Sequence, residues 1–254
     1  MEFSRSLTAT RVWFAATILF SSLCGLTAQI NPLSASPAVI AARAVAQFAE
    51  TQKRFQSDPT NVVAAWEFAR AGFDRAECAT NDAERAAIAI QGIAACRQGL
   101  ARNPESAPAH YYLGMNLGQL AQTKFLGALK IVDEMEREFK AALALDEHFD
   151  QAGPHRNLGR LYFEAPAIGS VGSRAKARKH LERAVELAPD FPENRLNLAE
   201  AGAKWREKKM LQRELDALEK LWPAARTNFT GADWETAWAD WQKRYDKLRA
   251  GAGH

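Results

Sequence analysis

The stretch HRNLGRLYFEAPAIGSVGSRAKARKHLERAVELAP, residues 155–189, contains two segments with helical periodicity joined by a loop. In both segments the residues on one face are small or apolar and recur every three or four positions: Leu158, Gly159 and Tyr162 in the first, and Ala177, Leu181 and Ala184 in the second. Glycine and alanine allow two helices to approach closely, large side chains fill the remaining space, and Pro189 stops the second helix. The stretch therefore predicts a helix-turn-helix unit.

The same spacing recurs along most of the chain. Three further segments carry it, with Trp66, Gly92, Cys96, Gly99 and Pro104 in the first, Leu113, Gly114, Leu117, Met135, Phe139 and Ala142 in the second, and Leu198, Ala199, Leu211, Leu215, Leu218 and Pro223 in the last. Pro223 follows Pro189 by 34 residues, the length of a tetratricopeptide repeat (TPR). The chain resembles a TPR protein, so we expect an all-α, right-handed helical solenoid of about four helix-turn-helix units over 58–223, preceded by a leading helix over 38–57.

His110 and His155 occupy the same position in two of these units, because each precedes a Leu-Gly pair by three residues. Trp66 stands at this position in the first unit, and TPRs place a large packing residue there. Equivalent positions of stacked units lie about one repeat apart. We therefore interpret both histidines as packing residues and not as a chemical pair.

Two insertions interrupt the regular repeat. Residues 124–134 are expected to lengthen the second helix of the second unit by about two or three turns. Residues 165–173 are expected to form a loop, with Ser173 as the N-cap of the next helix. The Gly169–Ser173 run lacks the Lys-Ser/Thr pair of a P-loop and the strand that precedes it, so a phosphate-binding loop is disfavoured.

Residues 1–28 have the layout of a secretory signal peptide. Arg5 and Arg11 precede the apolar run 12–23, and small residues lead to a candidate cleavage site at Ala28. The run is shorter than the ~18 apolar residues of a spanning helix, so cleavage is favoured over a retained anchor. We expect a linker at 29–37 and a periplasmic or secreted mature chain with no stable membrane span.

The charge balance of the expected mature chain gives no indication of a nucleic-acid partner. After residue 28, 31 Lys and Arg residues face 29 Asp and Glu residues. Proteins that bind nucleic acids show a clustered basic surface, which this balance does not predict. We therefore expect no nucleic-acid partner.

Cys78 and Cys96 are the two cysteines of the expected mature chain. If Asn81 and Asp82 form the turn of an antiparallel helix pair, Cys96 lies roughly 20 Å from Cys78. A disulfide requires Cα atoms within about 7 Å. We expect two small, buried and unpaired residues.

Residues 224–254 are expected to form a C-terminal capping helix and a tail. Its apolar residues follow one another in steps of three or four and form one stripe: Trp234, Trp238, Trp241, Tyr245 and Leu248. An open solenoid requires a cap over its last unit, which favours a packing role for the stripe. A surface for a partner or a membrane is the alternative.

The sequence contains no recognised arrangement for catalysis. His-Glu-x-x-His, Gly-x-Ser-x-Gly and Cys-His arrangements of known spacing are absent. Asp146, His148 and Asp150 alternate in one turn, but they make no complete ligand set for a metal. We expect a protein that is not an enzyme and that holds no cofactor and no metal.

The resemblance to TPR proteins implies that a partner binds on the concave face, which the first helix of each unit lines. The candidate partner-binding residues are Glu67, Tyr111, Met115, Arg156, Arg160, Phe163 and Glu200. Arg156 and Arg160 lie four residues apart on one helix face, and if unpaired they suit a carboxylate or an acidic peptide. The alternative is that they pair with Glu67, Glu164 or Glu200.

Two families show closer resemblances. The run 152–162, with Pro166 and the Gly/Ser loop, is similar to the T component of tripartite ATP-independent periplasmic (TRAP) transporters, and the lengthened helix resembles the regulator-of-microtubule-dynamics TPR proteins. The first resemblance implies a periplasmic scaffold that associates with a substrate-binding protein. The predicted function is an exported scaffold for a protein or peptide partner. The alternative is a carrier of a small apolar ligand, or a transporter accessory subunit.

Overall fold

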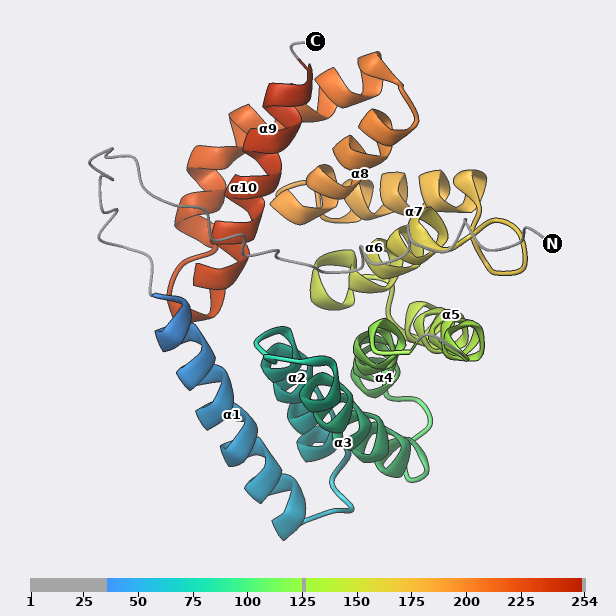
Figure 1. Cartoon of the computed structure of the whole chain (residues 1–254), viewed down its shortest axis with the longest axis vertical. Coiled ribbons are helices and arrows are strands. Elements are labelled where there is room, and N and C mark those ends of the chain that lie inside the picture. Colours follow the sequence, from blue (N-terminus) through green and yellow to red (C-terminus); the bar gives the residue numbers. More distant parts are fainter. Residues whose placement is uncertain (1–35, 125–126, 253–254) are drawn as a thin grey trace, which may run out of the picture.

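The computed structural model describes residues 36–124 and 127–252, and all regular structure in these residues is helical. The helices follow one another around a superhelix (Figure 1): α1 (Pro37–Ser57), α2 (Val62–Glu77), α3 (Asp82–Leu100), α4 (Ala107–Gln122), α5 (Ala128–Leu145), α6 (Phe149–Glu164), α7 (Arg174–Leu187), α8 (Pro192–Lys204), α9 (Lys208–Asn228), the short η1 (Ala232–Trp234) and α10 (Glu235–Ala252). Helices α2 to α9 pack as four consecutive pairs. The predicted fold class, a helical solenoid of TPR type, is confirmed.

Helices α6 and α7 pack as the 155–189 pattern predicts. Leu158 and Leu181 are fully buried between them. A Cβ atom added to Gly159 would lie 2.7 Å from the Leu181 side chain and 3.1 Å from its backbone nitrogen, so only glycine permits this approach. The two helices of the preceding unit approach equally closely at a glycine, because a Cβ on Gly114 would lie 2.6 Å from the Phe139 ring.

The helix starts use local side-chain caps. Asn61, Asn81, Ser106 and Ser173 each accept a hydrogen bond from a backbone N–H in the first turn that follows them. These bonds satisfy donors that have no partner within the helix. The predicted N-cap at Ser173 is confirmed, and residues 165–173 connect α6 to α7 without regular structure, as expected.

Helix α5 begins later than the sequence predicts. Its first residue is Ala128, whereas the predicted extension begins at Lys124. Gly127 has a left-handed backbone conformation (φ 83°), which prevents the helix from continuing back through it. The resulting helix has 18 residues, compared with 19 in α3, 14 in α7 and 21 in α9, so the predicted extension by two or three turns is not observed.

Helix α9 continues through Pro223 to Asn228, so the prediction that this proline ends the last repeat helix is wrong. A proline removes one backbone hydrogen bond, here to the carbonyl of Glu219, an exposed residue. Beyond the proline, Ala225 is completely buried and its carbonyl accepts the N–H of Phe229. Tertiary packing against α10 therefore maintains the helix past Pro223.

Helix α10 packs on α8 and α9 and covers the last unit. Trp238 and Trp241 are buried in a cluster with Phe191 and Leu218, and the Trp238 indole N–H donates to the Phe229 carbonyl (2.7 Å). The tryptophan stripe is thus a packing surface, as expected for a cap. The predicted leading helix corresponds to α1, which packs on α2.

The expected signal peptide at 1–28 lies outside the described residues, as does the expected linker up to residue 35. Among the helices that the structure describes, none combines the length and apolar character needed to cross a membrane. Cys78 and Cys96 are unpaired, as predicted. Burial is confirmed for Cys96, whereas Cys78 is partly exposed.

His110 and His155 serve separate units and do not contact each other. His110 lies between Glu138 (Nδ1 to Oε2, 2.6 Å) and the Pro104 carbonyl (Nε2 to O, 2.9 Å). The Nδ1 atoms of His155 and His180 are 2.9 Å apart, and Glu147 lies 3.4 Å from Nε2 of His155. Both predicted packing roles hold, but the sequence did not indicate His180 as a neighbour.

We expect His180 to make the folded chain less stable as the pH is lowered from 7 to 5, while Asp74 and Glu77, whose pKa values are raised, act in the opposite direction. Burial, with the charges of His155 and Lys179, lowers the pKa of His180 from 6.5 to about 4. Between these two values the unfolded chain binds a proton that the folded chain does not bind, so acid favours unfolding by about 1–2 kcal/mol at pH 5. Urea denaturation of the unchanged chain and of His180→Phe at both pH values isolates this contribution, because the variant should lose less stability, or gain more, between pH 7 and pH 5 than the unchanged chain does.

The exposed His148 provides the matched control for this measurement, because its side chain is 68% exposed. His148→Ala should keep the full pH dependence of the unchanged protein. If His180→Phe and His148→Ala show the same pH dependence, His180 is not the titrating group.

Candidate functional site

The inner side of the superhelix is the candidate site. The first helices of the four units, α2, α4, α6 and α8, contact one another in sequence, and α10 continues the row beyond α8 (Figure 1). The two ends of the chain also meet, because Nη1 of Arg43 in α1 donates to the Ala232 carbonyl and to Oε2 of Glu235, both at 3.0 Å. The inner surface is therefore bounded by helices from every part of the described chain.

Arg156 is buried in a hydrogen-bonded network. Its Nη2 donates to Oδ2 of Asp150 (2.6 Å) and to the hydroxyl of Tyr111 (3.1 Å), and that hydroxyl donates to the same carboxylate oxygen (2.5 Å). Arg156 is 5% exposed and Tyr111 is 1% exposed. Contrary to our prediction, neither residue is accessible to a partner. The arginine has an ion pair, but with Asp150 and not with the glutamates considered from the sequence.

A left-handed turn at the start of α6 explains this burial. Asp150, Gln151 and Ala152 have φ values of 51°, 56° and 62°, which residues other than glycine rarely adopt. The turn aims the carbonyls of Asp150 and Gln151 at Nη1 of Arg156, at 3.0 and 3.1 Å. The guanidinium also lies over the Phe191 ring, 5.0 Å from its centre. Arg156 therefore holds this turn in place.

Arg160 and Glu200 form a second network at the other end of α6. Oε2 of Glu200 accepts from Nη1 of Arg160 (2.8 Å), and Oε1 accepts from Nε of Arg244 in α10 (2.8 Å). Burial alone raises the pKa of Glu200, but the two guanidinium groups hold it below its ordinary value. Arg160 also lies 3.7 Å from Glu164. The network ties α6, α8 and α10 together, and the alternative that Arg160 pairs with Glu164 and Glu200 is the one observed.

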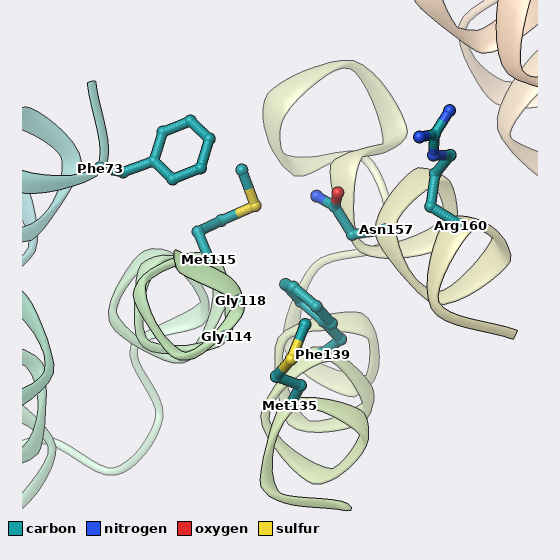
Figure 2. Close-up of a pocket in the computed structure, with 8 residues that line it drawn as sticks. All are labelled: Phe73, Gly114, Met115, Gly118, Met135, Phe139, Asn157 and Arg160. Carbon is teal, nitrogen blue, oxygen red and sulfur yellow. The ribbon is translucent and has the colours of Figure 1, made fainter. Parts of the chain in front are cut away.

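The remaining predicted residues lie in three different places. Glu67 accepts from Nη1 of Arg54 in α1 (2.7 Å), at the N-terminal end of the inner surface. Phe163 packs edge-on against Trp205, with ring centres 5.8 Å apart. Met115 faces the interior between helices α2, α4 and α6 (Figure 2). Of the predicted set, the structure brings Arg160, Phe163 and Glu200 together.

Met115 is one of the residues that line a small hollow. Figure 2 shows the residues that line it, which come from α2, α4, α5 and α6: Phe73, Gly114, Met115, Gly118, Met135, Phe139, Asn157 and Arg160. Its volume is about 20 Å³, which is room for about one water molecule. The hollow is mostly apolar, but it is too small for an organic ligand.

A cleft lies where the C-terminal ends of α6, α8 and α10 meet the start of α9. Its volume is about 1080 Å³, and Arg160, Phe163 and Glu200 form one of its walls. Lysines from the start of α9 and from α10 form the other walls. A space of this size is comparable with known ligand pockets. The cleft is the part of the inner surface best suited to hold a binding partner.

Two carboxyl groups of α2 lie at the opposite end of the inner surface. The surrounding protein desolvates Asp74 and Glu77 of α2 and raises their pKa values to about 6 and about 7. Asp150 and Asp233 add to the shift at Asp74, and Arg70 opposes it. Both residues are exposed, and Arg85 opposes the shift at Glu77. Each of the two carboxyl groups thus has an arginine nearby.

The carboxylates near the predicted turn have structural partners. Oδ1 of Asp146 accepts from the backbone N–H groups of His148 and Phe149. Within 36–124 and 127–252, no group of three or more His, Cys, Asp or Glu residues is placed to hold a metal ion. The described surface offers charged groups, hydrogen-bonding groups and apolar contacts for recognition.

Sequence reasoning did not identify Arg244, Asn197 or the lysines of the cleft. The predicted binding residues all come from the first helix of a unit, and the last helix is predicted only as a cap. Asn197 accepts from both Arg160 and Arg244 and is 1% exposed. One signal was available, because Arg244 lies three residues after Trp241 and α10 continues the row of first helices.

The paired helices and the lined inner surface define a helical solenoid of TPR type, a class that generally serves as a scaffold for protein–protein interactions. The sequence profile of the family "Regulator of microtubule dynamics protein 1-3" matches residues 41–170, just over half of the chain. This chain belongs to that family.

One solved structure supports the fold. The chain is similar to TTC0263, a thermophilic TPR protein of Thermus thermophilus, with a TM-score of 0.60 and 15% identity over 84% of this chain and 97% of that chain. MamA gives a TM-score of 0.46 and 16% identity over 71% of this chain and 88% of that chain. A comparison with curated proteins gives no significant match. The likeness to TTC0263 concerns the fold alone.

Proposed function

We propose that this chain is an exported, non-catalytic scaffold that binds a protein or peptide partner on the inner side of its superhelix. The observation that carries the proposal is the cleft of about 1080 Å³ bordered by Arg160, Phe163 and Glu200. These three side chains are partly exposed and come from the first helices of two successive units. Export is proposed from the signal-peptide layout of residues 1–28.

A carrier of small apolar ligands is less well supported. Such a ligand would need an enclosed apolar space beside helix α5. The hollow at that place is lined by Met135 and Phe139, but its volume of about 20 Å³ admits about one water molecule (Figure 2). The resemblance to the T component of TRAP transporters remains an expectation drawn from the sequence.

Site-specific photocrosslinking tests the proposal. A photoreactive phenylalanine analogue at Phe163, on the cleft wall, should form a discrete adduct with a polypeptide in the native host. The same analogue at Ile90, which is 52% exposed on the second helix of the first unit, is the matched control and should form none. The intact mass of the recovered chain should lack residues 1–28.

Three results would contradict the proposal. Equal adducts from both positions would indicate non-specific contact. A chain that keeps residues 1–28 would remove the export step. A mass excess of a few hundred daltons, with no crosslinked polypeptide, would favour a small-molecule carrier instead.

A further inference from the structure

The cleft at the C-terminal end of the inner surface is strongly basic. Seven of its lining residues are Lys or Arg, and two are Glu. The expected mature chain as a whole has nearly equal numbers of basic and acidic residues, so this charge is a local feature. The three helices that form most of its walls, α8, α9 and α10, lie beyond the family segment at 41–170.

The two glutamates of the cleft already have partners. Glu200 binds Arg160 and Arg244, and Glu164 lies 3.9 Å from the ammonium group of Lys204, which also sits 4.4 Å from the centre of the Phe163 ring. The negative charge inside the cleft is therefore neutralised by residues of its own wall.

Four cations of the cleft remain available to a ligand. Arg206, Lys208, Lys209 and Lys247 are exposed, and within the described part of the chain none of their side chains has a hydrogen-bonding or ion-pair partner. Mutual repulsion of like charges disfavours such a cluster unless an anion compensates it. The cluster is therefore matched to a ligand with several negative charges.

The position of two lysines strengthens this argument. Lys208 and Lys209 begin α9, where the partial positive charge of a helix N-terminus favours acidic residues, and the first turn contains none. The preceding residue Glu207 makes no side-chain cap to α9 and binds Arg174 and Arg178 instead. Helix stability does not explain these two lysines, whereas binding of an anionic group does.

The size and walls of the cleft favour a polypeptide over a free anion. A volume of about 1080 Å³ greatly exceeds that of a phosphate group. Ala203 and Gly251 are small and exposed, so a backbone can approach them closely, and Leu248 is partly exposed and offers apolar contact. The basic walls of the cleft therefore favour an acidic segment at this end of the inner surface.

We propose that this cleft, with Lys208, Lys209 and Lys247 as the main cationic contacts, binds an acidic segment of the partner polypeptide that also carries an apolar residue. The inference rests on the proposed function as a peptide-binding scaffold, and it assigns both the place and the chemistry of recognition. Binding through exposed charges is sensitive to ionic strength, so the affinity should fall as salt is added.

Fluorescence anisotropy with a labelled peptide of Glu and Asp residues around one Leu tests the inference on the purified chain. The charge reversal Lys208→Glu with Lys209→Glu should weaken binding at least about tenfold. The matched control, Lys53→Glu with Lys130→Glu, makes the same change in net charge at exposed residues outside the cleft and should change binding less than about twofold. All four lysines are exposed, so both variants should melt like the unchanged chain.

Several outcomes would overturn the inference. Equal losses in the two variants would mean that only net charge matters, and equal binding of a Gln/Asn version of the peptide would mean that charge does not matter. Binding of anionic phospholipid vesicles without binding of the peptide would identify a membrane surface as the ligand. A partner captured at Phe163 equally by the unchanged chain and the Lys208→Glu/Lys209→Glu variant would keep the scaffold function but reject the two lysines as its contacts.

Discussion

Replacing Gly159 with alanine should lower the free energy of unfolding by about 2–3 kcal/mol. The added methyl group would lie 2.7 Å from the Leu181 side chain and 3.1 Å from the Leu181 backbone nitrogen. Leu181 is completely buried, and its backbone belongs to α7, so neither group can move without separating α6 from α7. This cost should exceed the gain of about 1 kcal/mol that alanine usually brings to a helix interior.

Chemical denaturation monitored by circular dichroism measures the effect. Gly251→Ala is the matched control, because Gly251 also lies in a helix, but a Cβ atom there would meet nothing within 4 Å. That variant should be as stable as the unchanged protein or slightly more stable. If the two alanine variants have the same stability, then the close approach of α6 and α7 at Gly159 is not required by the fold.

The repeat architecture was predictable because its determinants lie close together in the sequence. Gly159 and Leu181 are 22 residues apart and belong to one unit, so the spacing of small and large residues within that unit specifies their contact. The same holds for Gly114 and Phe139. Turn residues such as Asn81 and Ser173 mark the helix starts by a purely local mechanism.

The candidate site was less predictable because it depends on contacts between units. The role of Arg156 depends on a left-handed turn at residues 150–152. None of these three residues is a glycine, so the sequence does not indicate the turn. The cleft combines residues of α6, α8, α9 and α10, and the spacing within any one of these helices does not reveal that Lys208 and Arg244 share a wall. The course of α9 past Pro223 likewise depends on packing against a helix that comes later in the chain.

Replacing Arg156 with alanine should cost about 2–3 kcal/mol of stability, because it removes a buried guanidinium group that donates to the partly exposed Asp150 carboxylate and to the carbonyls of Asp150 and Gln151. Asp150 would keep only the Tyr111 hydroxyl, and the carbonyls of Asp150 and Gln151 would lose the guanidinium that faces them. Arg156→Lys should have an intermediate effect, since an ammonium group keeps the charge but cannot reach all of these acceptors at once. Urea denaturation of the three proteins gives the order.

The arginine at position 102 provides the control, because it is exposed and has no described side-chain partner; Arg102→Ala should change stability by less than about 0.5 kcal/mol. Adding Asp150→Asn to Arg156→Ala should recover part of the loss, since the unpaired charge is then removed. If Arg156→Ala instead left stability unchanged and weakened only partner binding, Arg156 would be a recognition residue after all. Because Arg156 is buried, we expect its loss to lower stability and to have no direct effect on partner contacts. Arg160, in contrast, lines the cleft.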